Sequence, residues 1–493
     1  MSKSKESNFV VQFALRTERY HEEVLNKRFE IGRGIYNSLV CLTQKRYKEM
    51  VKTKLYRETT DKLKSEKRDS ERKGLIEQLR LLRLRYGINE YAFHSDVKGM
   101  QGYFKTNIDS FTAQKIASRL WRAYEDLMFD DAKAIHYKKY GTFNSLEGKS
   151  NDTGIRYKDG NIIWNKLKIA VEIDYKNPYE ALSMEKKIAY CRILRKYIKG
   201  KYKFYVQIVF KGIVPRKIEE SSGEFKHILG KGDVGLDIGT QTLAISSEKE
   251  VKIYELAERV VSIEEEKRRI IRKMDRSRRE SNPNNFNEDG TVKKQGKKKV
   301  MWVKSKHYMK DGSILRELYR KQADIRKLEH EIMANYVISL GDNIYVETMN
   351  FKGLQKRSKR TEKNEQGKYK RKKRFGKSLG KKAPAMLLSI INRKLGYFGR
   401  SLIKIDTHKV KASQYNHVEE INKKKKLSER WNFIEGKRVQ RDMYSAFLIM
   451  NVEDDLEEIN KAKCRERYEK FLDLHDKEVE RLRGKKNISS IAI

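Results

Sequence analysis

Cysteine is scarce in this sequence. The chain of 493 residues contains only Cys41, Cys191 and Cys464, which lie far apart and form no CxxC pair. Disulfide frameworks and cysteine-rich zinc sites both need several cysteines at short spacings. We therefore expect an intracellular protein without either feature.

Long apolar runs and prolines are also scarce. No segment approaches the roughly twenty apolar residues of a membrane-spanning helix, and no signal peptide opens the chain. Both absences argue against a membrane protein. There are four prolines, and none precedes Pro178. Long helices can therefore run through the first part of the chain without interruption.

Positive charge is abundant. Lysine and arginine number 112 against 68 acidic residues, which gives a formal net charge of +44. Charged residues make up 37% of the chain, whereas about a quarter is usual. Such a field requires a polyanionic partner, and without a membrane signal the favoured partner is nucleic acid. The length predicts about three domains of about 150 residues each.

The hydrophobic periodicity changes along the chain. Residues 8–16 alternate apolar and polar side chains and predict a strand, and the spacing becomes helical over about 18–138. Strands return at about 141–212, with a hairpin indicated by the Asp159-Gly160 dipeptide. We expect the first strand to join the later ones in a small barrel, with the helices as an insertion.

The helical region carries Arg and Lys in amounts that suit binding to a duplex surface. The alternative for any one helix is a basic face that is merely solvated. In the strand region, Trp164 and Tyr157 could stack on nucleobases. Burial in the core is the favoured interpretation for Trp164.

Three acidic residues stand in distinctive contexts. Asp237 lies in DVGLDIGTQTLAISS, which predicts a strand, a turn and a second strand; Glu347 lies in NIYVETMNF, a short buried strand; and Asp442 lies in VQRDMYSAFLIM, the start of a helix. A buried carboxylate is costly unless it is paired or holds a cation. Two divalent ions about 4 Å apart, held by such groups, can activate a water to attack a phosphodiester. Taken singly, each acid is more often a cap or a half-exposed residue than a metal ligand.

The order of the three acidic residues and their sequence contexts resemble a known active site. VGLDIG, then YVE, then an RD that opens an apolar helix resembles the split active site of the RuvC nucleases, a branch of the ribonuclease H fold. Further motifs, among them GNIIWNKLKI, KYKFYVQIVFKGI and RFGKSLGKKAPAML, resemble the transposon-encoded TnpB proteins and the compact type V CRISPR effectors descended from them. The resemblance covers roughly residues 140–452.

The resemblance implies a multidomain α+β protein in three parts. A helical recognition domain is inserted in a small β-barrel wedge domain, and a ribonuclease H-like (RuvC) α/β nuclease domain follows. The implied boundaries are 1–17 for the first strand of the wedge barrel, 18–138 for the recognition domain, 139–228 for the rest of the wedge barrel, and 229–493 for the nuclease domain.

The implied activity is that of an RNA-guided DNA endonuclease, a metal-dependent hydrolase that cuts double-stranded target DNA next to a short adjacent motif. Guide pairing would supply the sequence recognition. Asp237, Glu347 and Asp442 would be catalytic. Asp237 with Glu347 would hold one Mg²⁺ and Asp237 with Asp442 a second, and Mn²⁺ could substitute. We expect a bacterial cytoplasmic protein, nucleoid-associated when bound, that acts as a monomer or as a homodimer on one guide RNA.

The chain departs from the family pattern in two places. A four-cysteine ribbon usually lies between the second and third acidic motifs, but the corresponding target-strand loading insert, 406–440, contains no cysteine. We therefore expect no zinc, and expect His408 and His417 to cap or pack. The third motif has Tyr444 and Ser445 where Asn and Ala are more usual.

A basic loop follows the second acid. Residues 352–382 contain fifteen Lys or Arg and two Glu. Such a run is usually flexible and solvated, but its place directly after Glu347 suits a grip on a phosphate backbone near the metals. The predicted nucleic-acid-binding residues of this loop and of the insert are Lys352, Lys356, Arg357, Arg371, Lys372, Lys373, Arg374, Lys377, Lys424 and Lys425.

Two other functions stay open. One is a nuclease-inactive RNA-guided DNA-binding repressor, against which the retention of all three acids argues. The other is a transposition or recombination factor that acts without RNA, with the basic N-terminal half as its DNA-binding module. The sequence does not predict whether a guide derives from a CRISPR array or a transposon end.

Overall fold

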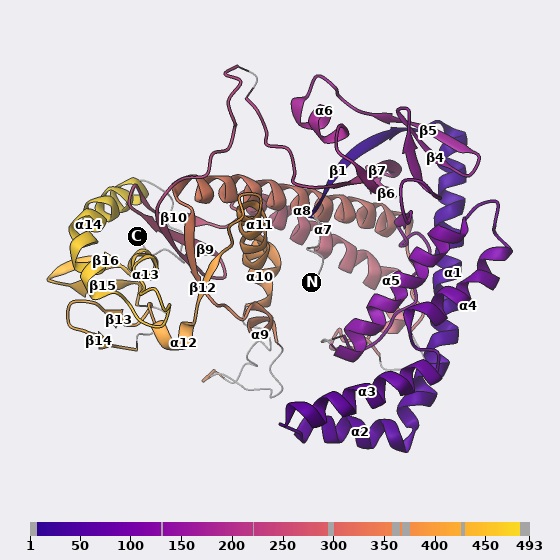
Figure 1. Cartoon of the computed structure of the whole chain (residues 1–493), viewed down its shortest axis with the longest axis horizontal. Coiled ribbons are helices and arrows are strands. Elements are labelled where there is room, and N and C mark those ends of the chain that lie inside the picture. The colour runs from indigo at the N-terminus through magenta and orange to yellow at the C-terminus, as the bar shows by residue number, and fades with distance from the viewer. Residues whose placement is uncertain are drawn as a thin grey trace. The chain divides into compact units, whose positions relative to one another are not determined.

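The computed structural model describes residues 7–129, 132–219, 221–293, 300–356, 365–366, 375–424 and 429–483. The chain divides into two compact units, Met1–Ile218 and Glu219–Ile493. Each unit combines helices with a β-sheet (Figure 1). The prediction of a multidomain α+β protein is therefore confirmed.

The first unit begins with a strand and a run of helices. These elements are β1 (Asn8–Arg16), α1 (Arg19–Lys52), α2 (Lys54–Ser65), α3 (Asp69–Arg85), α4 (Glu90–Gly102) and α5 (Ser110–Phe129). In α1 the residues Leu25, Phe29, Tyr36 and Leu39 are buried, a spacing of three, four or seven that keeps one stripe of the helix against the core. The strand predicted for 8–16 is confirmed.

The remaining elements of this unit complete one antiparallel sheet. They are β2 (Ser145–Glu147), β3 (Arg156–Lys158), β4 (Asn161–Trp164), β5 (Leu167–Glu172), α6 (Pro178–Met184), β6 (Ile188–Ile198) and β7 (Lys201–Lys211). The strand order is β2-β6-β7-β1-β5-β4-β3, so the first strand lies between β7 and β5. The predicted turn joins β3 to β4, with positive φ at both Asp159 and Gly160.

The expected small barrel is present in part. Among the described residues of this unit no hydrogen-bonded ladder joins the two end strands, β2 and β3, so the sheet is a curled half-barrel. The end strands have three residues each, and such short edges offer few backbone groups with which to close a barrel.

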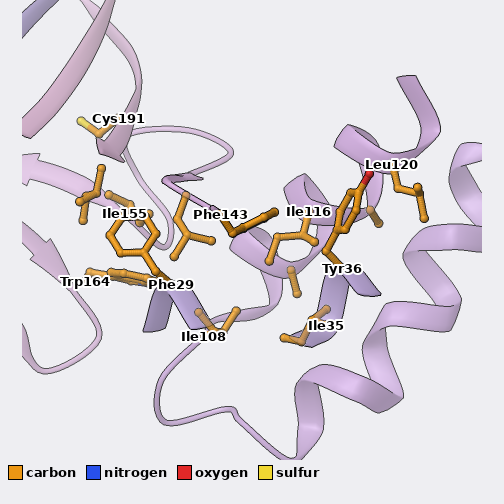
Figure 2. Packing of buried hydrophobic residues seen from close by; sticks show 14 of the residues in the cluster. Phe29, Ile35, Tyr36, Ile108, Ile116, Leu120, Phe143, Ile155, Trp164 and Cys191 are labelled. Atoms are coloured by element: carbon orange, nitrogen blue, oxygen red, sulfur yellow. The ribbon is translucent and has the colours of Figure 1, made fainter. Parts of the chain in front are cut away.

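The core of the first unit joins the helices to this sheet (Figure 2). Trp164 is fully buried, as predicted. Its indole Nε1 donates a hydrogen bond to Asp109 at 2.8 Å, and the Arg28 guanidinium lies 4.4 Å from the ring centroid. One aromatic side chain thus ties α1 and the start of α5 to the end of β4.

The second unit opens with a mixed sheet and a helical hairpin. Its elements as far as the last strand of this sheet are β8 (Asp233–Ile238), β9 (Thr242–Ser247), β10 (Val251–Glu255), α7 (Val260–Glu280), the short 3₁₀ turn Pro283–Asn285, α8 (Lys306–Leu340), β11 (Asn343–Glu347), α9 (Phe351–Gln355), α10 (Gly376–Lys382), α11 (Pro384–Gly396) and β12 (Ile403–Ile405). The order β10-β9-β8-β11-β12 has antiparallel pairs among the first three strands and parallel pairs from β8 to β12.

The C-terminal part of this unit contains short hairpins and two helices. The elements are α12 (Thr407–Val410), β13 (Tyr415–Asn416), β14 (Ile421–Asn422), β15 (Trp431–Ile434), β16 (Lys437–Gln440), α13 (Arg441–Met450) and α14 (Lys461–Arg483). The predicted helix at the third acidic motif is therefore present. Within the described ranges, no helix has both the length and the apolar character needed to cross a membrane.

The two faces of the mixed sheet carry different side chains. Val234, Leu236 and Ile238 of β8 belong to the apolar cluster that includes residues of α8 and α11. Because side chains alternate along a strand, Gly235 and Asp237 point to the opposite face, where α13 packs. The site is therefore built on the α13 face.

Candidate functional site

Asp237 and Glu347 lie at corresponding ends of neighbouring parallel strands. The register of β8 and β11 pairs Leu236 with Val346, and both acids stand one residue further along. Adjacent strands lie about 5 Å apart. Val346 belongs to the apolar cluster on the α8 face, so Glu347 points to the α13 face, as Asp237 does. The sheet itself therefore brings the first two acids together.

Gly235 lets α13 bring the third acid to the same place. A Cβ at Gly235 would lie 2.0 Å from the Ala446 carbonyl oxygen and 2.6 Å from the Met450 nitrogen. The absence of a side chain therefore permits direct contact between the helix backbone and the strand. Asp442 lies one turn before Ala446, towards the end of the strand at which Asp237 lies. The three predicted acids converge through this contact.

The carboxyl group of Asp237 is the electrostatic centre of the site. Burial raises its pKa well above the usual value, and the negative charges of Asp442 and Glu347 raise it further. Arg441 and the Ser445 hydroxyl act in the opposite direction, although the Ser445 oxygen has no hydrogen-bond partner at ordinary distance. We therefore treat Ser445 as a close neighbour of Asp237 and not as a formed hydrogen-bond donor.

Glu347 is the second buried carboxylate with a raised pKa. Burial raises its pKa to about 7, while the Ala412 backbone N–H favours the charged form. Its Oε1 atom is buried and has no hydrogen-bond partner. An unsatisfied buried carboxylate oxygen is costly, and a divalent cation is the kind of ligand that would satisfy it.

Two arginines partly balance the negative charge of Asp442. Burial raises its pKa, and Arg430 and Arg441 lower it. The Arg430 Nη1 atom lies 3.5 Å from Asp442 Oδ2, with 27% and 16% of the two side chains exposed. All three acidic residues keep some accessible surface.

The donor set fits a hard divalent cation, because carboxylate oxygens are the ligands that Mg²⁺ prefers. In the part of the chain that the structure describes, no three His, Cys, Asp or Glu side chains form a group that could hold one ion. A two-ion site needs no such group, because each ion would take two carboxylates, with Asp237 shared. Water and phosphate oxygens would complete each shell.

The basic residues predicted to bind nucleic acid are only partly described. Lys352 lies in α9, Lys356 follows it, Lys377 lies in α10, and Lys424 follows β14; all four are exposed. The other predicted residues lie outside the described residues: Arg357, Arg371, Lys372, Lys373, Arg374 and Lys425.

Lys382, at the end of the same basic loop, has a structural role. It is buried and its Nζ atom lies 2.6 Å from Glu255 Oε1. The charge run is therefore not uniformly available to a phosphate backbone. The described ends of the loop are helical, because α9 and α10 frame it.

The two histidines of the insert differ in environment. His417 is buried, and its Nδ1 lies 2.7 Å from the Tyr444 hydroxyl oxygen. Its ring also packs against Phe447 and Tyr468, and burial lowers its pKa to about 4. His408 is exposed in α12. Tyr444, a departure from the family pattern, thus anchors the insert to α13.

Three features of the site escaped the sequence analysis. Arg430 lies twelve residues before Asp442 and reaches it only because β15 and β16 form a hairpin. Ser445 carried a signal, since it lies three residues after Asp442 on the same helix. Gly235 lies two residues before Asp237 in the same motif, but its close approach to the backbone of α13 depends on the fold.

No family model matches the chain, and no curated protein matches its sequence. Among solved structures, the cryo-EM structure of a Cas12f1–sgRNA–target DNA complex has a chain with 11% identity and a TM-score of 0.43, covering 91% of this chain and 99% of that one. A CRISPR-Cas12f ternary complex gives 13% identity and a TM-score of 0.23, covering 89% of this chain and 86% of that one. These TM-scores are too low for the likeness to indicate a shared fold.

Proposed function

We propose that the protein is an RNA-guided DNA endonuclease that cuts target DNA beside a short adjacent motif by two-metal phosphodiester hydrolysis. One observation carries the catalytic part. Asp237, Glu347 and Asp442 come from segments far apart in sequence, and the structure groups them so closely that two of them raise the pKa of the third. Perturbed carboxylates of this kind gather at functional sites.

The carboxylates would hold the ions in a fixed arrangement. Bound Mg²⁺ ions would activate a water and stabilise the leaving oxygen of the phosphodiester. Asp237, central in the cluster, would contact both ions, and Glu347 and Asp442 would each contact one. Arg430 would be released from Asp442 when a cation takes its place, which leaves a guanidinium at the edge of the site.

The guided part of the proposal rests on the sequence motifs. VGLDIG, YVE and the RD-led helix resemble the RuvC motifs in order and context, and the motifs between them resemble compact RNA-guided nucleases. The net charge of +44 supports a large polyanionic partner. The proposed partners are therefore a guide RNA and double-stranded target DNA.

The decisive experiment begins with nucleic acid that copurifies with the protein. Sequencing should return one defined noncoding RNA, and the reconstituted complex should cut matching duplex DNA when Mg²⁺ or Mn²⁺ is supplied. A defined RNA without cutting would indicate the repressor instead. DNA binding or joining with no bound RNA would indicate the transposition or recombination factor, and either result would overturn the proposal.

A further inference from the structure

A second charged site lies in the first unit. A cavity of about 220 Å³ opens between α5, β2 and β6, and we call it the α5 pocket. Its charged lining consists of Lys115, Arg119, Arg122, Glu147 and Arg192. Nothing in the catalytic proposal accounts for this group.

The helix supplies three of the cations from one face. Lys115, Arg119 and Arg122 are spaced by four and three residues, so their side chains stand one above another on α5. Another face of the helix, with Ala117 and Leu120, is buried in the core. The core therefore fixes the direction in which the cationic face points.

Neighbouring side chains hold the inner cations in place. Glu147 accepts a hydrogen bond from Arg192 Nε at 2.9 Å and lies 3.2 Å from Lys115 Nζ. The Arg192 Nη1 atom also donates to Gln207 at 3.1 Å. The single carboxylate is thus fully engaged, and it orders two cations.

Arg119 is held in place by a different set of neighbours from those of Lys115 and Arg192. Its Nη1 donates to Ser145 Oγ at 3.1 Å, and its guanidinium lies 4.8 Å from the centroid of the Phe143 ring, which packs in the core beside Ile116 (Figure 2). Arg122 is exposed, and none of the hydrogen bonds or ion pairs among the residues described in this unit involves it. A ligand would therefore meet one fixed and one adaptable arginine.

Positive charge in the α5 pocket is not balanced. Four cationic groups face one carboxylate, which leaves a surplus of three charges. Arg119 is exposed at its outer end. Desolvation lowers its pKa, the charges of Arg192 and Arg122 lower it further, and Tyr36 and Glu147 act in the opposite direction. Bound negative charge would relieve this repulsion.

We propose that the α5 pocket binds one phosphate group of a nucleic acid, with Arg119 and Arg122 as its principal ligands. Guanidinium forks match the geometry of phosphate oxygens, and the cavity has room for a phosphate and part of its sugar. The nucleic-acid source of this phosphate rests on the proposed function. Free inorganic phosphate has the same chemistry and is distinguished by the test.

The test compares a double variant, Arg119→Gln with Arg122→Gln, with a control of equal charge change, Lys54→Gln with Lys64→Gln. The control lysines lie on α2 in the same unit, and their side chains are 86% and 71% exposed. Calorimetric titration with inorganic phosphate measures the pocket directly. Anisotropy of a fluorescent oligouridylate over a range of salt concentrations measures its use by nucleic acid.

We expect the wild-type protein and the control to bind phosphate and the double variant to bind it at least about tenfold more weakly. The plot of log affinity for oligouridylate against log salt should flatten by about 0.7 for one lost contact. Unchanged phosphate binding would overturn the proposal. Lost phosphate binding with an unchanged slope would overturn its nucleic-acid part and assign the pocket to free phosphate.

Two additions keep the result interpretable. Arg122→Gln alone removes an exposed side chain, so it should fold normally by circular dichroism and still weaken phosphate binding. Asp237→Ala should retain the wild-type phosphate affinity. The phosphate titration therefore remains decisive even if no guide RNA or cutting activity is found.

Discussion

The acidic site of the second unit (Asp237, Glu347 and Asp442) and the α5 pocket of the first unit each bring like charges together, but the charges have opposite signs. In the acidic site, three carboxylates face one another with too little positive charge, and the pKa values of all three are raised. In the α5 pocket, arginines and a lysine surround one carboxylate. In the acidic site, a bound cation would relieve the repulsion between the carboxylates. In the α5 pocket, a bound anion would relieve the repulsion between the cationic side chains.

The two sites should therefore respond differently to pH. Burial raises the pKa of Glu347 to about 7, so this carboxylate of the acidic site changes charge near neutrality. Arginine guanidiniums stay protonated. The proposed nuclease would therefore lose metal ions from the acidic site before it loses its hold on phosphate as the solution becomes acidic.

The largest expected effect is loss of cutting without loss of phosphate binding. Asp237→Ala should reduce the cleavage rate by at least about a thousandfold, because it removes the carboxylate shared by both ions. Single-turnover cleavage measures the effect. Asp233→Asn, at the opposite end of the same strand and beside Arg467, is the matched control and should cut normally. Normal cutting by Asp237→Ala would falsify the assignment of the site.

Replacement of Gly235 is expected to have the next largest effect on cleavage. In Gly235→Ala the new Cβ would collide with backbone atoms of α13, which cannot rotate away as a side chain could. We expect a loss of about 3 kcal/mol in the free energy of unfolding and about a hundredfold loss in cleavage, because displaced ligands are poorly aligned. Gly239→Ala, whose nearest contact would be 3.4 Å away, should change neither. Equal behaviour of the two variants would remove the proposed role of the helix contact.

The third prediction concerns the pH dependence of stability in metal-free protein. The folded pKa of Glu347, about 7, lies above the unfolded value of about 4.3. The folded state therefore holds the proton more tightly, and the stability that this group contributes is complete below about pH 4 and is lost as the pH rises through 7.

Urea unfolding across this range should show the wild-type protein losing about 3 kcal/mol more than Glu347→Gln. Saturating Mg²⁺ should reduce the difference, since the cation takes the place of the proton. A wild-type curve that rises with pH relative to the variant would contradict the predicted sign.

The smallest expected effect concerns Arg430. Arg430→Gln removes a cation that competes with metal for Asp442, so Mg²⁺ should bind the free protein about threefold more tightly at about pH 8, as expected for a part-exposed ion pair. Arg467→Gln is the control, because its Nη1 lies 3.5 Å from Asp233 with similar exposure. Calorimetric titration of each variant with Mg²⁺ measures the difference in affinity. Weaker Mg²⁺ binding by Arg430→Gln alone would show that Arg430 supports the site.

The sequence predicted well those elements whose signal is local. The alternation in residues 8–16, the Asp159-Gly160 turn and the strand context of Asp237 each depend on a few neighbouring side chains. The small barrel was found only in part, because nothing within a strand determines whether the sheet edges meet.

The candidate site shows the same division. Motif order suggested three acids, but their meeting depends on the crossing from β8 to β11 and on a helix packed against Gly235. Arg430 and the pairing of His417 with Tyr444 are contacts between segments without a shared pattern. Such contacts follow from the fold and could not be predicted from spacing.

The position of β1 in the middle of its sheet has a consequence for synthesis on the ribosome. Its partners are β5 on one side and β7, ending at Lys211, on the other. At typical translation rates, β1 must wait on the order of 10–40 s for β7. During that time neither partner strand is available to the two edges of β1. A tag that fills the space around Asn8, or a truncation beyond Arg16, would divide the sheet at its centre.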